Sequence, residues 1–569
     1  MKKNFRTPIL LALIVIGGGM VSLRLPVKED YFEMSKQLEI LNSAFRELNI
    51  FYVDPLSPGD LMKTGIEAIL ESLDPYTRYY PESKMEDVRF MSTGEYGGVG
   101  LSLGERWDGT FFITDIQEGS PAEISGLRLG DNLVEINGQT VSNLNMKKIG
   151  ELIKGTSGTD IEIGVSHANT SEIVTFSITR QKIKRPDVPY YGMISDSTGY
   201  LILSKFTRTA SVEVRKALIQ LTDSMGAKQI VFDLRGNGGG LLREAVNIVN
   251  LFVPKGQEVV SMRGKTADWN KNYGTTRKAL LPDIPLVILM DDRSASASEI
   301  VAGTLQDLDR AVIIGQESFG KGLVQQTKKL AYGSRIKITV AKYYTASGRC
   351  VQRLHYDDKN SDGNATIQAD STLKTFYTNN GRPVIEGRGV IPDIEILPED
   401  FGFVVGGIMN SELIFDFVVH TINNAELNNE LAEEIDAKGF GISDKQWNEF
   451  VEFALQELDS ELLLNSKRKF PYESNTTTLV STLEKTMADD GFLAENTDLV
   501  SKLKSLVKPN LEEDLSRNEE TLRDLISEEM IFHYKNTSGV FIYSLPKDAV
   551  ALSAVSTLEG KEYLKVLGF

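Results

Sequence analysis

Three serines at the start of a predicted helix are candidates for covalent chemistry. Ser294, Ser296 and Ser298 follow the continuous apolar run 285–290, which is typical of a buried strand, and precede a helical segment that reaches residue 305. A helix start offers unpaired N–H groups and positive potential, which together stabilise a developing oxyanion. Serine at a helix start is most often only an N-cap, so the pattern indicates a nucleophile only if a base lies nearby.

Lys321 is the best candidate for that base. It stands between Gly320 and Gly322, directly after the strand-like segment 311–314. The four histidines lie outside the glycine-rich and strand-end motifs of this region: His167, His355, His420 and His533. The sequence therefore argues against a Ser-His-Asp triad. A desolvated lysine without a close carboxylate can act as the general base instead, because burial disfavours the ammonium form.

Two glycine motifs near these residues invite a nucleotide-binding interpretation that their details contradict. Gly315, Gly320 and Lys321 have P-loop spacing, but position 322 is glycine and not the Ser/Thr that would ligate magnesium. The run 230–242 (IVFDLRGNGGGLL) has leucine at position 241, where a dinucleotide fingerprint needs its third glycine. A glycine turn above a strand end suits an oxyanion hole, because its backbone N–H groups face the substrate unobstructed.

An earlier glycine-rich segment predicts a site for chain ends. In YGGVGLSL (96–103) the backbone N–H groups of Gly97, Gly98, Val99 and Gly100 can converge on a carboxylate at the start of an alternating strand. Together with IQEGSPAEISG (116–126), LGD (129–131) and VEING (134–138), it makes the segment 95–183 resemble a PDZ domain. The resemblance implies that the C-terminus of another protein adds as a strand beside this loop.

The combined motifs resemble the carboxyl-terminal processing peptidases, also called tail-specific proteases, which are PDZ-containing serine peptidases. The resemblance runs from about residue 35 to residue 396. It rests on the PDZ segment and on SLDPYTRYY (72–80), DLRGNGGG (233–240), SASASEIVAG (294–303), QD (306–307), FGKG (319–322) with Gln325, and AKYYTASGR (341–349).

The resemblance implies roles for five residues. Ser296 is the nucleophile, Lys321 is the base 25 residues later, and Gln325 orients the lysine. The backbone N–H groups of Ala297 and Gly239 form the oxyanion hole. No metal ion or cofactor is implied.

Some alternatives stay open from the residues alone. Ser294 and Ser298 could replace Ser296 as the nucleophile, and Gln325 could be a packing residue of a strand. Asp307 lies about three helical turns beyond Ser296, so we expect it to be structural or supporting. Asp233 and Arg235 are expected to shape the glycine turn.

The elements that must position these residues form a multidomain α/β protein. The composition, with 41% hydrophobic and 25% charged residues, is that of a globular protein and excludes a largely disordered or polytopic membrane chain. By resemblance, a β-rich PDZ domain is inserted into a crotonase-like peptidase core with helical elements at both ends. The expected domains are a signal anchor or signal peptide (1–30), an N-terminal helical region (31–94), the PDZ domain (95–183), the peptidase core with a contribution from the N-terminal region (184–398), and an acidic helical C-terminal domain (399–569).

The N-terminus predicts export. Residues 7–23 are uncharged and follow Lys2, Lys3 and Arg6, which is the charge pattern of an export signal. A clean Ala-x-Ala cleavage site is absent, which favours an uncleaved anchor over a cleaved signal peptide. The expected location is the periplasmic side of the inner membrane, with the protein anchored by residues 7–23 or released after signal cleavage.

Charge and apolar patterning bear on partners. The chain carries a net charge of −17, and residues 401–569 hold 30 acidic against 15 basic residues, so the acidity belongs to the C-terminal part. No basic run longer than residues 467–469 occurs, which argues against a nucleic-acid partner. Apolar stripes at 38–48 and 447–462 predict a homodimer. The expected partners are otherwise proteins with free C-termini, as substrates.

The predicted function is a serine endopeptidase. It recognises the C-terminal tails of exported proteins through its PDZ domain and cleaves them through an acyl-enzyme formed by a Ser-Lys(-Gln) centre. The competing hypothesis is a catalytically silent PDZ scaffold or chaperone that only binds C-termini. The intact set of Ser296, Lys321 and Gln325 argues against it.

Overall fold

The chain divides into two compact units, residues 1–72 and 73–569. The computed structural model describes residues 31–82, 93–106, 108–167, 170, 172–360, 363–399, 401–422, 435, 439–458, 475–507 and 511–569. The expected export segment 7–23 lies outside them. In the first unit, helices α2 (Tyr31–Phe51) and α3 (Pro58–Glu71) follow the expected helical pattern, and α2 buries none of its side chains.

A six-stranded sheet forms the centre of the second unit. Its strands follow the order β10-β11-β12-β15-β16-β23, and all neighbours run parallel except the antiparallel pair β10–β11. The strands are β10 (Tyr190–Met193), β11 (Thr198–Ile202), β12 (Gln229–Asp233), β15 (Leu286–Met290), β16 (Val312–Gly315) and β23 (Ile394–Glu395). Every residue of β12 and β15 is buried, as expected for strands covered on both faces.

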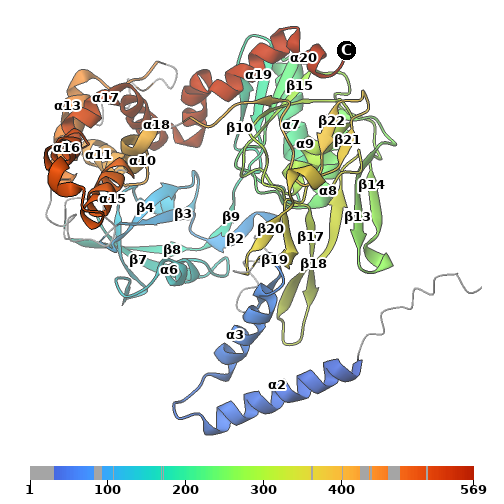
Figure 1. Ribbon diagram of the computed structural model, residues 1–569, viewed down its shortest axis with the longest axis horizontal. Helices are drawn as coiled ribbons and strands as arrows, with labels where there is room; N and C mark the ends of the chain where they lie inside the picture. Colours follow the sequence, from blue (N-terminus) through green and yellow to red (C-terminus); the bar gives the residue numbers. More distant parts are fainter. Residues whose placement is uncertain are drawn as a thin grey trace, which may run out of the picture. The chain divides into compact units, whose positions relative to one another are not determined.

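Different helices cover the two faces of this sheet (Figure 1). One face packs against α7 (Ala210–Ile219), α8 (Leu242–Phe252) and α9 (Ala297–Asp307), and the other against α19 (Ala549–Glu559) and α20 (Glu562–Val566). In β12, Phe232 contributes to the first core and Val231 to the second, because successive side chains of a strand point to opposite faces. The last helices therefore share a core with this sheet, although the expected boundary at residue 399 assigns them to a separate domain.

A second sheet includes a strand from the segment that precedes the expected PDZ domain. β1 (Arg78–Tyr80) pairs antiparallel with β18 (Arg335–Tyr344) in the order β1-β18-β13-β14, and β17 (Leu323–Lys329) also pairs with β18. The remaining strands are β13 (Glu258–Gly264) and β14 (Lys271–Gly274). The chain leaves these two sheets after β1 and returns to them at β10, so the segment expected to be a PDZ domain is an insertion, as expected.

The PDZ segment has its own sheet and core. Its sheet order is β3-β4-β5-β7-β8 with β6 on β5, and β2 and β9 form a separate ladder. The elements are β2 (Glu95–Gly98), β3 (Leu101–Glu105), β4 (Phe111–Ile116), α5 (Pro121–Ser125), β5 (Asn132–Ile136), β6 (Gln139–Thr140), α6 (Met146–Ile153), β7 (Asp160–Ser166), β8 (Ile173–Thr179) and β9 (Gln181–Lys184). Because β3 is an edge strand of the described sheet, its outer backbone groups can pair with an added strand.

Helices dominate the described part of the chain after residue 401. They are α10 (Gly402–Met409), α11 (Leu413–Ile422), α13 (Asp444–Leu458), α15 (Asn475–Asp489), α16 (Leu493–Leu506), α17 (Leu511–Arg517) and α18 (Glu519–Ser544). Before them lie β19 (Leu354–Lys359), β20 (Ala365–Ile367), β21 (Thr375–Tyr377) and β22 (Pro383–Ile385).

The apolar stripe expected to support a homodimer lies mostly inside this helical part. Trp447, Phe450 and Ala454 of α13 are buried in a core that they share with Phe417 and Met530. The described portion of the stripe at 447–462 is therefore internal packing and gives no support to the expected homodimer.

No single described helix is long and apolar enough to span a bilayer. Only the pair α10 and α11, bent by 56°, reaches that length and composition when the two helices are taken together.

Candidate active site

The residues expected to do chemistry surround one cleft of about 740 Å³. Ser296, Ala297, Lys321 and Gln325 all line it, as does Gly240 of the glycine turn. The turn follows β12 and the serine segment follows β15, so both stand at the carboxyl ends of neighbouring parallel strands. This edge is where open α/β sheets form their binding crevices.

Ser296 occupies a strained turn between β15 and α9. Its backbone angles, φ 57° and ψ −108°, are unusual for a residue with a side chain. Its carbonyl accepts a hydrogen bond from the Tyr343 hydroxyl at 3.1 Å, and its N–H donates to Glu299 Oε2 at 2.7 Å. Contacts on both sides of the residue thus fix the strained conformation that carries its side chain to the cleft.

The two neighbouring serines have structural contacts. Ser294 is fully buried, and its hydroxyl lies 2.9 Å from both the Leu234 carbonyl and an Asp291 carboxylate oxygen. Ser298 is also fully buried, and its hydroxyl donates to the Asn237 carbonyl at 2.8 Å. Neither lines the cleft among the described residues, so the geometry favours Ser296 of the three.

Glu299 is a buried residue next to Ser296 to which the sequence analysis gave no role. Its fully buried carboxylate accepts hydrogen bonds from the N–H groups of Ser296 (2.7 Å), Gly320 (2.8 Å) and Lys321 (2.9 Å) and from the Ser318 hydroxyl (2.6 Å). Burial raises the pKa of Glu299, and these hydrogen bonds oppose the shift. One carboxylate therefore ties the serine turn to the lysine loop. The signal was Ser-x-x-Glu (296–299), a capping-box pattern.

Lys321 is largely desolvated. Burial, reinforced by repulsion from Lys337, lowers the pKa of Lys321 to about 8, while Glu299 and Asp74 pull it upward. Its Nζ lies 4.2 Å from the centre of the Tyr76 ring. No described hydrogen bond joins this Nζ to Ser296 Oγ. The lysine thus shares the cleft with Ser296 but rests against an aromatic face.

Gln325 lies on β17 and lines the same cleft. Its Nε2 donates a hydrogen bond to Thr339 Oγ1 at 3.3 Å. The Thr339 N–H in turn donates to the Thr77 hydroxyl at 3.2 Å, within the SLDPYTRYY segment. No described hydrogen bond connects the Gln325 amide to Lys321, so the expected orienting role stays a prediction.

Gly239 lies directly against the serine turn. A Cβ at this glycine would stand 2.8 Å from the Ala297 nitrogen and 2.9 Å from Ser296 Cβ, and its φ is +95°, so a side chain is excluded. The Gly239 N–H donates to Asn237 Oδ1 at 2.8 Å, whereas no described hydrogen bond uses the Ala297 N–H. One of the two expected oxyanion donors is therefore open and the other is held by a neighbouring side chain.

Arg235, at the start of the glycine turn, is held from two directions. It forms an ion pair with Asp233 (2.6 Å), the last residue of β12, as expected from the sequence. It forms a second, two-pronged pair with Asp548, at 3.2 Å and 2.6 Å. Asp548 is also the N-cap of α19, because its side chain accepts from the Val550 and Ala551 N–H groups. The C-terminal part of the chain thus reaches the glycine turn.

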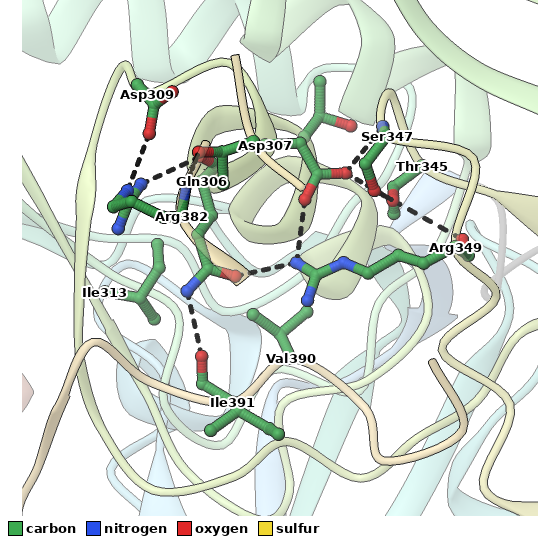
Figure 2. A network of polar contacts seen from close by, with 12 residues as sticks. Gln306, Asp307, Asp309, Ile313, Thr345, Ser347, Arg349, Arg382, Val390 and Ile391 are labelled. Atoms are coloured by element: carbon green, nitrogen blue, oxygen red, sulfur yellow. Dashed lines mark hydrogen bonds and ion pairs between the residues drawn. The ribbon is translucent and has the colours of Figure 1, made fainter. Parts of the chain in front are cut away.

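Asp307 belongs to a buried polar network at the end of α9 (Figure 2). Its carboxylate forms a fully buried ion pair with Arg349 at 3.0 Å and accepts from Thr345 Oγ1 at 2.5 Å and the Ser347 N–H at 2.9 Å. It is not among the described residues that line the cleft. These contacts support a structural role, as expected.

The expected carboxylate loop divides between a strand and a turn. Gly97 and Gly98 belong to β2 and pair with Lys182 and Gln181 of β9, whereas Val99 and Gly100 form the turn into the edge strand β3. Gly100 has φ +88°, and a Cβ there would lie 2.3 Å from Ser120 Cβ. No described hydrogen bond uses the N–H of Val99 or Gly100. The turn therefore offers free donors beside an open strand edge.

Comparisons with known proteins show which families the chain resembles. Family models match residues 197–358 (Peptidase family S41), 87–166 (PDZ domain) and 405–558 (Probable PDZ-protease, C-terminal helical domain). The Carboxy-terminal-processing protease of Bartonella bacilliformis is 32% identical over 56% of this chain and 73% of its own length. Carboxy-terminal processing protease CtpA of Bacillus subtilis is 32% identical over 55% of this chain and 66% of its own length.

A solved structure, the photosystem II D1 C-terminal processing protease, is 25% identical over 65% of this chain and 95% of its own length, with a TM-score of 0.35. That score is too low to support an argument about domain arrangement. Together, the fold and the family matches define a PDZ-containing serine-type peptidase of multidomain α/β architecture, with a helical domain in its C-terminal part. The chain belongs to the carboxy-terminal processing protease family.

Proposed function

We propose that this protein is an endopeptidase that cleaves exported proteins after it has bound their free C-terminal tails. Ser296 Oγ attacks a peptide carbonyl while neutral Lys321 accepts its proton, and the N–H groups of Ala297 and Gly239 bind the oxyanion. The peptide C–N bond then breaks as Lys321 returns the proton to the leaving amine. Water attacks the resulting acyl-enzyme, again with Lys321 as the base, and releases Ser296.

The observation that supports this proposal is the pairing of residues on one cleft. Ser296, in a strained turn at a helix start, shares the cleft with a lysine whose pKa is lowered to about 8. A lysine of that pKa is partly neutral near physiological pH, which a general base requires.

Two described contacts must change before the reaction. Lys321 Nζ must leave the Tyr76 ring for Ser296 Oγ, and the Gly239 N–H must exchange Asn237 Oδ1 for the oxyanion. Catalytic hydrogen bonds often tighten only when substrate binds, and we assign that effect here to the docked substrate. In the rearranged site Gln325 orients the lysine amine.

The PDZ domain supplies tail recognition in this proposal. A substrate C-terminus adds as a strand to the free edge of β3, and its carboxylate accepts hydrogen bonds from the turn at Val99 and Gly100. The tail is thereby held while a more N-terminal peptide bond enters the cleft. A substrate with an amidated C-terminus should be cleaved more slowly than the same chain with a free carboxylate, and equal rates would contradict this part of the proposal.

The cellular setting of the proposal rests on the sequence. Residues 7–23 act as an uncleaved anchor or a cleaved signal, and place the protease on the periplasmic side of the inner membrane, where exported substrates occur. Sedimentation analysis of the purified protein tests the expected homodimer, and a monomer at all concentrations would remove it.

The central experiment compares wild type, Ser296→Ala and Lys321→Ala on an unstructured protein that ends in small apolar residues. Cleavage is followed by mass spectrometry. Both variants should lose at least about 10³-fold in kcat/KM, because nucleophile and base act as one unit. Tail-peptide binding should be unchanged in both. Equal cleavage by all three proteins would refute the assignment, and equal binding without any cleavage would favour the silent scaffold.

A further inference from the structure

The charges around the cleft are all of one sign among its described lining residues. Six lining residues are basic and none is acidic: Arg208, Arg243, Lys271, Lys321, Arg335 and Lys337. The whole chain holds 79 acidic against 62 basic residues, so its composition alone would favour acidic side chains in such a cleft. The basic lining is therefore a local property and not a reflection of the chain.

The basic side chains come from several elements around Ser296. Arg208 follows β11, Arg243 lies in the first turn of α8, and Lys271 begins β14. Arg335 and Lys337 stand at the start of β18. This strand belongs to a different sheet from β12, the strand that the glycine turn follows. Positive charge is thus available to a bound chain from more than one wall.

None of the cleft's basic side chains has a carboxylate partner within ion-pair distance among the described residues. Other arginines of the same unit are paired, such as Arg235 with Asp233, Arg349 with Asp307 and Arg382 with Asp393. The nearby Glu299 is fully buried, and its oxygens accept four hydrogen bonds from the turns that it joins. Apart from Lys321, which the proposed mechanism needs as a neutral base, the basic residues of the cleft therefore keep a positive charge that an acidic substrate segment can pair with.

Lys337 shows the cost of this arrangement. Burial and the neighbouring Arg78 lower its pKa, and Asp74 only partly opposes them. Unpaired cations that crowd one another raise the free energy of the empty site, and an acidic ligand lowers it again. Apolar lining residues such as Met262 and Trp269 do not distinguish acidic from basic substrates, so selection by substrate charge must come from the basic groups.

We infer that the cleft selects substrate segments that carry Asp or Glu within a few residues of the scissile bond. The inference rests on the proposed function, because it concerns the chain that Ser296 attacks. It adds a second layer of selection: the PDZ domain reads the C-terminus, and the cleft reads the charge of the segment to be cut.

Matched peptides test the inference. Two peptides share the same apolar C-terminal tail and the same scissile region, and differ only in Glu or Gln at the positions that flank the cut. The Glu peptide should have a kcat/KM about 5- to 20-fold higher at low ionic strength, and the advantage should shrink at about 0.5 M salt, because screening weakens exposed charge pairs.

Charge-removing variants locate the effect. Arg243→Gln and Lys271→Gln should lower kcat/KM for the Glu peptide more than for the Gln peptide, so the ratio of the two values should fall towards one. Lys228→Gln is the matched control, since this exposed lysine precedes β12 at the opposite end of the sheet and should change neither rate.

The outcomes separate this inference from the proposed function. Equal cleavage of both peptides by wild type, with loss of both in Ser296→Ala, overturns the cleft inference and leaves the peptidase intact. If neither peptide is cut, the peptidase proposal fails, and binding of the two peptides to wild type then decides. A tighter Glu peptide supports the charge selection, and equal affinities overturn it.

Discussion

At the scale of single residues, the electrostatic setting of Lys321 governs when the site can work. In the proposed mechanism the general base is the neutral amine of Lys321, so the active fraction should grow as the pH rises through the pKa of Lys321, which is about 8. Repulsion from Lys337 contributes to the lowered pKa of Lys321. The neighbouring cation therefore helps to make the lysine usable as a base.

This setting predicts a shift in the pH profile. In wild type, kcat/KM should rise with pH to a plateau, with a midpoint near 8. Lys337→Gln removes a positive neighbour, so the pKa of Lys321 and the midpoint should both move upward. Lys329→Gln, an exposed charge change on β17, is the control and should leave the midpoint in place. A downward shift in Lys337→Gln would contradict the assignment of Lys321 as the base.

Glu299 sets a second expectation at this scale. Glu299→Gln replaces an oxygen acceptor by an N–H₂ group that faces N–H donors, so at least one buried donor loses its partner. The free energy of unfolding should fall by about 1–3 kcal/mol, as measured by denaturant titration. Glu317→Gln breaks a more exposed ion pair with Arg388 and should cost less than about 1 kcal/mol. Similar losses in the two variants would show that Glu299 is not the tie between the two turns.

At the scale of elements, helix α19 supports the glycine turn from outside the family's catalytic motifs. Its N-cap Asp548 accepts two hydrogen bonds from Arg235, and the turn that begins with Arg235 places Gly239 against Ser296. Asp548→Asn keeps a good N-cap but removes the charge that pairs with Arg235. We expect kcat to fall about 5- to 50-fold, because a misplaced oxyanion donor weakens transition-state binding, while KM and tail-peptide affinity stay the same.

A control on the same helix separates position from stability. Glu559, at the other end of α19, accepts a hydrogen bond from Ser195 at 2.8 Å. Glu559→Gln should leave kcat unchanged, and both variants should have nearly the wild-type Tm. A fall in kcat that tracks a fall in Tm in both variants would reduce Asp548 to a structural residue.

The contrast between Ser296 and Asp548 shows what the sequence could predict. The serine turn, the glycine turn and the flanked lysine are local patterns, since close approach to a substrate demands small residues at strand ends. Glu299 also belongs to a local pattern, the Ser-x-x-Glu capping box at 296–299. Asp548 belongs to none, because only the packing of α19 on the peptidase sheet brings it to Arg235. The family resemblance likewise predicted the α/β core, but not that the last helices would cover one of its faces.

At the scale of the whole molecule, the C-terminal helices are part of the peptidase core. Tyr200, Val287 and Ile314 on one sheet face share a core with Ala551 and Leu558 of α19. Removal of residues 545–569 would expose this apolar face, so the shortened chain should aggregate or lose cooperative unfolding. Removal of Phe569 alone, which is 78% exposed, should leave the melting curve unchanged. Circular dichroism and light scattering decide, and a well-folded monomer lacking 545–569 would contradict the shared core.

The charge pattern also belongs to this scale. The net charge of −17 is concentrated after residue 400, whereas the described lining of the cleft is basic. The acidic surface favours solubility, and the basic cleft favours acidic segments of other chains.

The contact between Arg235 and Asp548 also has a consequence for biosynthesis. Ribosomes deliver Ser296 and Lys321 long before Asp548, so the nucleophile and base exist in a nascent chain whose glycine turn still lacks its outer support. One face of the central sheet stays uncovered over the same interval. In the proposed mechanism, the glycine turn therefore has its outer support only after Asp548 has been synthesised and α19 has packed on the sheet.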